Sequence, residues 1–127
     1  MKVGIKNQIK KMVSSDLTAK AMGSGRLDVF ATPAMVAMME EAAHTSVEAE
    51  LEEGQGTVGT SMSVSHLAAT PVGMEVTCES ELIEVDGRKL VFEIKAMDKA
   101  GLIGEAKHER FIIDSEKFLA KTKAKLK

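Results

Sequence analysis

Aromatic residues, proline and cysteine are scarce in this chain of 127 residues. It contains no Trp or Tyr, four Phe, two Pro and a single Cys. The lone Cys78 excludes an intramolecular disulfide and fits a reducing cytoplasm. Nucleic-acid binding is also disfavoured, because no basic stripe is interleaved with aromatic side chains. We therefore expect a cytoplasmic location and no nucleic-acid partner.

Long apolar runs and a strong net charge are absent as well. Hydrophobic residues make up 44% of the chain, but no run approaches the roughly 20 apolar residues that a membrane-spanning helix needs. The basic N-terminus has no continuous apolar block, so it does not resemble a secretory signal. The net charge is only −2. We expect one domain, residues 1–127, without a membrane partner.

The last eleven residues, 117–127, form a basic and helix-like tail. Such a tail can be a solvated terminal helix, which is the more common case. It can also be a surface that attracts an anionic ligand.

One segment, Ala31 to Leu51, predicts a long amphipathic helix. Thr32 followed by Pro33 is a helix start signal, and Gly54 follows the end of the pattern. Residues three and four apart share a face of a helix, which gives this segment an apolar stripe. The stripe consists of Val36, Met39, Ala43, Val47 and Leu51. Glu40 falls on the same face, where a carboxylate must find a partner, become neutral or serve a site.

Residues 57–114 predict four strands in hairpin succession, with turns at Asp86-Gly87 and at residues 98–101. Before the helix, residues 9–15 predict an edge strand and residues 21–26 a flexible connection. Consecutive hairpins make an antiparallel sheet, and one face of that sheet needs a cover. The predicted fold class is therefore α+β, with about five antiparallel strands wrapped around one long central helix.

Two polar residues occupy inward positions, Glu40 on the helix and His66 on the first of these four strands. Alone, each is more often a salt-bridged or hydrogen-bonded core residue. On facing surfaces, a Glu and a His form a recurrent acid–base pair. Thr32 is either a helix N-cap or a hydroxyl near the reacting group. Gly59 either marks a bulge or lets a ligand reach its backbone N–H.

A further polar cluster lies in the last predicted strand, at His108, Glu109 and Arg110. Arg110 either forms an ion pair with an acid such as Glu40 or contacts a ligand. His44 lies one helical turn after Glu40, but this spacing is a weak metal signal. We expect neither a metal nor a cofactor.

Three stretches together resemble hot-dog-fold thioesterases related to fluoroacetyl-CoA thioesterase. They are VFATPAMVAMMEEAA, GTVGTSMSVSHLAATPVGMEVT and GEAKHERFIIDSEKF, and the resemblance extends from about Phe30 to Phe118. It implies a hot-dog fold, hydrolysis of an acyl-CoA thioester to a carboxylic acid and free CoA, and a homodimer or tetramer with acyl-CoA bound near the subunit interface.

The resemblance also implies roles for individual residues. Thr32, Glu40 and His66 stand where the family has its catalytic Thr, Glu and His. Gly59 matches the glycine whose backbone N–H contacts the thioester carbonyl. Arg110 matches an arginine of the ligand-binding region. The resemblance leaves open whether Glu40 acts as nucleophile or as general base.

The aromatic lid of the fluoroacetyl-CoA enzyme has no counterpart before Thr32, where Phe30 is the one aromatic residue. We therefore expect a short- or medium-chain acyl group rather than fluoroacetate. Three alternatives remain: an acyl-CoA hydratase or dehydratase, an acyl-CoA-binding protein without turnover, and a structural dimer in which Glu40 serves stability alone.

Overall fold

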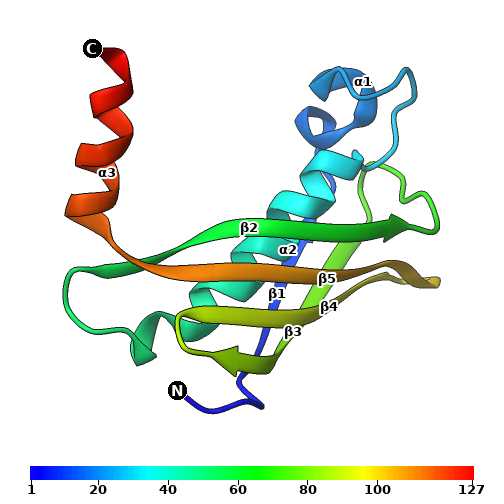
Figure 1. Ribbon diagram of the computed structural model, residues 1–127. Coiled ribbons are helices and arrows are strands. Elements are labelled where there is room, and N and C mark those ends of the chain that lie inside the picture. Colours follow the sequence, from blue (N-terminus) through cyan, green and yellow to red (C-terminus); the bar gives the residue numbers. More distant parts are fainter.

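A five-stranded antiparallel sheet curves around one long helix in the computed structural model, which describes residues 1–127 (Figure 1). The strands are β1 Lys6–Met12, β2 Gln55–His66, β3 Glu75–Asp86, β4 Lys89–Asp98 and β5 Gly101–Asp114. The helices are α1 Ala19–Met22, α2 Thr32–Val47 and α3 Ser115–Lys123. The predicted α+β architecture, with its long central helix, is confirmed.

The strand order in the sheet is β1-β3-β4-β5-β2. The predicted hairpins β3–β4 and β4–β5 are confirmed, and so is the edge position of β1. The expected hairpin between β2 and β3 is wrong, because β2 pairs with β5 at the opposite edge. The connection between β2 and β3, residues 67–74, is too long for a tight hairpin turn and leads the chain across the sheet.

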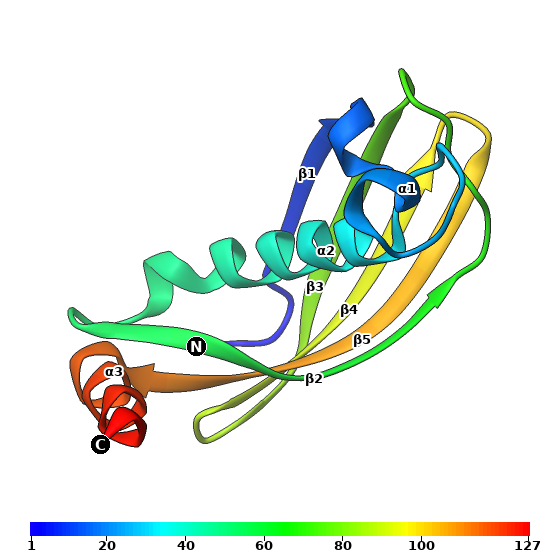
Figure 2. The same cartoon turned by 90° about the horizontal axis from the view of Figure 1, so that it is seen from above.

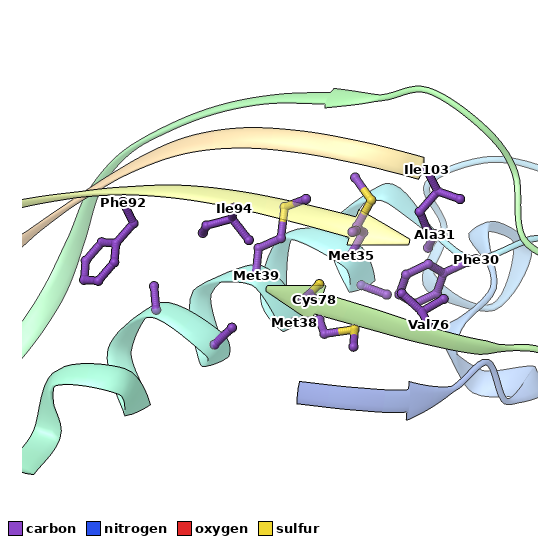
Figure 3. Close-up of a cluster of buried hydrophobic side chains, with 14 of the residues drawn as sticks. Phe30, Ala31, Met35, Met38, Met39, Val76, Cys78, Phe92, Ile94 and Ile103 are labelled. Atoms are coloured by element: carbon purple, nitrogen blue, oxygen red, sulfur yellow. The ribbon is translucent and has the colours of Figure 1, made fainter. Parts of the chain in front are cut away.

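The core lies between α2 and the inner face of the sheet. Three methionines of the helix pack against the sheet: Met35 and Met39 extend toward Ile103 and Ile94, and Met38 lies on the side of Cys78 and Val76 (Figure 3). The inner residues of β3 and β4 are buried as the alternation predicts. They are Val76, Cys78, Ser80 and Leu82 on β3, and Leu90, Phe92, Ile94 and Ala96 on β4.

The buried face of α2 is rotated relative to the predicted stripe. The buried residues are Ala34, Met35, Met38, Met39, Ala42, Ala43 and Val47. Val36, Glu40 and His44 form a row on one flank of this face, and each is only half-buried. The side chain of Glu40 is 42% exposed. The expectation that Glu40 faces the core is therefore wrong: it lies at the margin of the core.

The inner face of β2 is covered less completely than those of β3 and β4. Met62, Val64 and His66 alternate with exposed serines, as predicted, but they are only half-buried. Figure 2 shows the reason, because α2 lies over β1, β3 and β4 while β2 diverges from it. A strip of the molecule between α2 and β2 thus lacks a complete cover.

The segment before α2 is more regular than the sequence indicates. Of residues 21–26, expected to form a flexible connection, the first two belong to α1, a one-turn helix that Thr18 caps by accepting a hydrogen bond from the Ala21 N–H, while residues 23–26 are in neither helix nor strand, as predicted. A single helical turn is too short to show a hydrophobic period, so the pattern could not reveal it. No helix of the fold is long and apolar enough to cross a membrane.

Gly104 provides a test of the packing between β5 and α2. A Cβ at this position would lie 2.6 Å from the Sδ atom of Met35, and Met35 is fully buried. We expect Gly104→Ala to lower the free energy of unfolding by about 1–3 kcal/mol through overpacking. Chemical denaturation measures this change.

The control is the double variant Gly104→Ala/Met35→Ala. Because the shortened side chain leaves room for the new methyl group, the double variant should lose less stability than the sum of the two single variants. Strictly additive losses would contradict the proposed clash.

Candidate active site

The first feature of the site is a direct contact between Thr32 and His66. Thr32 Oγ1 lies 2.7 Å from His66 Nδ1, although the two residues belong to α2 and to the end of β2. Ala31, not Thr32, is the N-cap of the helix, and it makes no side-chain cap hydrogen bond. The N-cap interpretation of Thr32 is therefore wrong, and its hydroxyl instead orients the imidazole ring.

The second ring nitrogen of His66, Nε2, is buried and has no hydrogen-bond partner. Burial lowers the pKa of His66, and the backbone of Ala68 opposes this effect. The ring is therefore neutral at neutral pH. A neutral imidazole with one nitrogen held by Thr32 and the other unengaged is suited to proton transfer.

The Thr32–His66 pair lines a pocket of about 310 Å³ at the start of α2. The rest of the lining comes from the α1 region and from the loop after β2, and it consists mainly of small apolar residues. These residues are Ala19, Ser24, Val29, Phe30, Leu67, Ala68 and Ala69.

Glu40 lies apart from the Thr32–His66 pair, beside Gly59 and Arg110. Its Oε2 atom is 3.5 Å from Arg110 Nη1, which is the ion pair anticipated from the sequence. A Cβ on Gly59 would lie 2.9 Å from the same carboxylate oxygen. Glycine is required here because any side chain would displace the carboxylate.

Arg110 also makes three hydrogen bonds, to Thr57 and His108. Its Nε donates to Thr57 Oγ1 at 2.9 Å, and its Nη2 donates to the Thr57 carbonyl at 3.0 Å. Its Nη1 donates to His108 Nε2 at 3.1 Å. Since Arg110 is only 7% exposed, its guanidinium is a buried anchor for Glu40. Contact with a ligand remains a prediction for this residue.

His108 supports this anchor and received no separate role in the sequence analysis. Arginine cannot accept a hydrogen bond, so His108 Nε2 must be the acceptor and Nδ1–H must donate to the Ser61 carbonyl, 2.8 Å away. Burial lowers the pKa of His108, and Arg110 adds to the effect. The inward phase that His108 shares with Arg110 on β5 was the sequence signal for this pairing.

The structure does not bring Glu40 and His66 together within one chain. Thr32 and Glu40 are eight residues apart on α2, which is about 12 Å along the helix axis. Each chain thus carries two separate parts of a site, the Thr32–His66 pair and the Glu40–Gly59–Arg110 cluster. No group of three or more His, Cys, Asp or Glu side chains is arranged to hold a metal ion.

Comparison with known proteins identifies the family. The sequence profile of the fluoroacetyl-CoA-specific thioesterases matches residues 13–116. The chain belongs to this family. A family member, the fluoroacetyl-CoA thioesterase of Streptantibioticus cattleyicolor, is 45% identical over 98 residues, which are 77% of this chain and 70% of that protein.

Solved structures of thioesterases agree with this assignment. The fluoroacetyl-CoA thioesterase FlK superposes with a TM-score of 0.92 at 37% identity, over 98% of this chain and 97% of that one. A thioesterase superfamily member from Thermus thermophilus superposes with a TM-score of 0.88 at 27% identity, over 95% of this chain and 90% of that one.

Family membership confirms the predicted hot-dog fold and the predicted activity, hydrolysis of an acyl-CoA thioester to a carboxylic acid and free CoA. The alternatives of a hydratase, a dehydratase or a binding protein without turnover find no support in these relatives.

The buried His108 and the half-buried His66 predict how folding stability depends on pH. Each has a pKa below its ordinary value of about 6.5, so the unfolded chain binds more protons than the folded chain in mildly acidic solution. We expect the free energy of unfolding to fall as the pH drops below about 6.5. Chemical denaturation at several pH values measures this dependence.

The slope of the unfolding free energy against pH measures how many more protons the unfolded chain binds than the folded chain. The variant His108→Gln should decrease this number by at most one, whatever its effect on stability at neutral pH. The double variant His108→Gln/His66→Gln should decrease it further. An unchanged slope in both variants would show that the acid dependence arises elsewhere.

Proposed function

We propose that the protein acts as a homodimer in which each active site takes residues from both subunits. One subunit supplies Thr32 and His66, and the other supplies Glu40 and Gly59. The observation that carries this proposal is the separation of these two pairs within a single chain. Both pairs adjoin β2, so pairing of two β2 strands is a direct way to unite them.

The two edges of the sheet support this assembly, because they differ in charge. The outer strand β1 carries Lys6, Lys10 and Lys11, which discourage pairing with another chain. The outer strand β2 is 12 residues long and contains no charged residue and no proline. An unprotected edge of this length favours pairing with a second strand.

Symmetry then determines the arrangement. Two β2 strands that pair antiparallel in one continuous sheet are related by a two-fold axis perpendicular to that sheet, so both α2 helices lie on the same face. With the axis at Ser63, and with Thr60 as the extra residue of the β-bulge between Gly59 and Ser61, inward residues lie opposite inward residues and His66 lies opposite the partner's Gly59. Paired strands are about 4.8 Å apart, so the partner's Glu40 approaches the Thr32–His66 pair. The half-buried strip between α2 and β2 becomes covered in the same step.

The chemistry follows from these groups. The thioester carbonyl is polarised by the backbone N–H of the partner's Gly59, next to a β-bulge that interrupts the ladder between Gly59 and Ser61. The partner's Glu40 either helps to deprotonate the water that attacks the carbonyl carbon, or attacks that carbon itself and forms an anhydride that water then hydrolyses. In either route the neutral His66, oriented by Thr32, accepts at Nε2 the proton released by the attacking water and passes it to the CoA sulfur. The hydroxyl group of water thereby enters the carboxylic acid, and its remaining proton enters the thiol of free CoA.

The pocket beside His66 is proposed to hold the acyl group. Its volume of about 310 Å³ and its small apolar lining suit a short or medium chain. Phe30 is 2% exposed and belongs to the core, so it does not act as an aromatic lid. A variant of FlK has been solved with fluoroacetate and CoA, and this relative supports a CoA ester as the substrate here.

We also propose that the chain functions as one domain, residues 1–127, in the cytoplasm. The single cysteine supports this location, because Cys78 is buried and unpaired. Burial raises its pKa to about 12, so the thiol has no part in the chemistry.

Complementation between two inactive variants tests the composite site. Glu40→Gln and His66→Ala should each lower kcat by at least about a hundredfold, because each removes a group that transfers or accepts a proton. Random mixing of the two variant chains makes half of the dimers mixed, each with one intact site. The mixture should therefore recover about a quarter of the wild-type activity.

Mixing each variant chain only with itself is the matched control, and it should recover nothing. If the site lay within one chain, the mixture of the two variants would also stay inactive. Full activity of either variant alone would remove that residue from the mechanism. Sedimentation of each variant confirms that the comparison is made between folded dimers.

A panel of acyl-CoA esters, assayed by release of free thiol, tests the proposed substrate class. We expect acetyl- to hexanoyl-CoA to be hydrolysed with higher kcat/KM than long-chain esters, which exceed the pocket volume. Fluoroacetyl-CoA should show no large preference over acetyl-CoA, since no aromatic lid is present. A strong preference for the fluorinated ester would contradict this assignment.

A further inference from the structure

We infer that α3 of one subunit packs across the pocket mouth of the other subunit, where its lysines bind the nucleotide phosphates of acyl-CoA. This inference rests on the homodimer proposed above and assigns a second function to the partner subunit. It is carried by the position of α3, by two exposed apolar surfaces and by the charge of the C-terminal segment.

The helix α3 has an anchored start but no support along its length. The Asp114 side chain accepts a hydrogen bond from the Lys117 N–H, and the Ser115 N–H donates to the Gly54 carbonyl. No residue of α3 is buried. Figure 1 shows that α3 projects past the β2 edge, toward the region where a partner would lie. A helix that is anchored at its start but has no buried residue indicates a missing packing surface.

α3 and the pocket lie at opposite ends of the strand β2. Gln55, at the start of β2, pairs with Asp114, which directly precedes α3. His66, at the end of β2, lines the pocket. At about 3.3 Å per residue these ends are some 36 Å apart, and both views place α3 far from α1 (Figures 1 and 2). A chain's own α3 therefore cannot serve its own pocket.

The proposed two-fold axis exchanges these two ends. With the axis at Ser63 and Thr60 bulged, the partner's Gln55 lies opposite Thr70, just beyond the pocket residues of the loop after β2. Because α3 starts beside Gln55, the partner's α3 begins next to this loop. The same symmetry operation that completes the catalytic groups thus carries α3 to the pocket mouth.

Exposed apolar side chains are present at both ends of this contact. On α3, Phe118 and Leu119 are 40% and 54% exposed. Around the pocket, four large apolar side chains are also exposed: Met22 at 44%, Leu27 at 68%, Leu67 at 56% and Val72 at 46%. The dimer brings these two surfaces together, and burying them stabilises the contact.

The positive charge of the lysines on α3 determines what the helix can bind beside its apolar residues. The last eleven residues carry five lysines and no acidic residue, whereas the whole chain has a net charge of −2. Lys117 and Lys121 lie one turn apart on one flank of the apolar positions, and Lys123 lies on the other flank. These lysines reach the mouth of a pocket whose substrate carries a pyrophosphate and a ribose phosphate. Opposite charge at a shared mouth favours binding of that end of CoA.

The triple variant Lys117→Ala/Lys121→Ala/Lys123→Ala tests this role with two substrates. Loss of three exposed charge pairs should raise the KM for acetyl-CoA about tenfold and leave kcat unchanged. Acetyl-pantetheine lacks the nucleotide phosphates, so its kcat/KM should stay at the wild-type value. The salt dependence of KM for acetyl-CoA should also decrease.

The control removes three lysines elsewhere, in the variant Lys6→Ala/Lys10→Ala/Lys11→Ala on β1, and it should leave KM unchanged. An equal loss with both substrates, or an equal effect of the β1 variant, would overturn the inference. So would binding of the wild-type chain to anionic lipid vesicles through α3 together with an unchanged KM for acetyl-CoA in the α3 variant.

Mixed dimers test whether α3 acts on the other subunit. In one arrangement, a chain with His66→Ala and an intact α3 pairs with a chain that has an intact pocket and the α3 variant; KM should be normal. In the other, both changes are on one chain and its partner is wild type; KM should be raised. The opposite result would show that α3 serves its own pocket.

Calorimetric titration with CoA separates this inference from the proposed catalysis. The α3 variant should bind CoA about tenfold more weakly than wild type even if no ester is hydrolysed. Equal affinity for CoA would overturn the role of α3 while leaving the composite catalytic site intact.

Discussion

The packing of the methionine-rich face of α2 against the sheet is the interaction on which the rest of the structure depends. Met35 and Met39 are fully buried, and their unbranched side chains fill the irregular space under a curved sheet. This packing fixes the rotation of the helix about its axis. Thr32 consequently reaches His66 at the end of β2 and Glu40 reaches Arg110 on β5, and the interior itself contains no catalytic group.

Sequence periodicity was sufficient for the elements and insufficient for their rotation and neighbours. Alternation identifies the inner residues of β3 and most of those of β4 and β5, although Val91 and Ile103 are buried out of phase. In α2, apolar Ala and Met occur on nearly every side of the helix, so periodicity places the centre of the stripe part of a turn away from the buried face. Only contacts with the sheet distinguish Met35 and Met38, which are buried, from Val36, which is half-buried.

The sequence pattern identifies the polar residues of the site. Of their two partners in the fold, it indicates Arg110 for Glu40 but not Thr32 for His66. Inward placement singled out Glu40 and His66, and a direct pairing between them was a reasonable expectation. The actual partners, Arg110 and Thr32, depend on the pairing of β2 with β5 and on where β2 ends relative to the helix start. Strand alternation records which face a residue occupies, and it carries no information about which strand lies alongside.

The ion pair between Glu40 and Arg110 links catalysis to folding. Desolvation lowers the pKa of Arg110, and Glu40 counteracts this effect, so the carboxylate is also the counter-ion of a buried cation. Selection for a stable fold alone would then retain Glu40 in a descendant that had lost thioesterase activity. The presence of this glutamate in a related sequence is therefore weaker evidence of catalysis than the presence of His66. The Nε2 atom of His66 makes no hydrogen bond that would stabilise the fold.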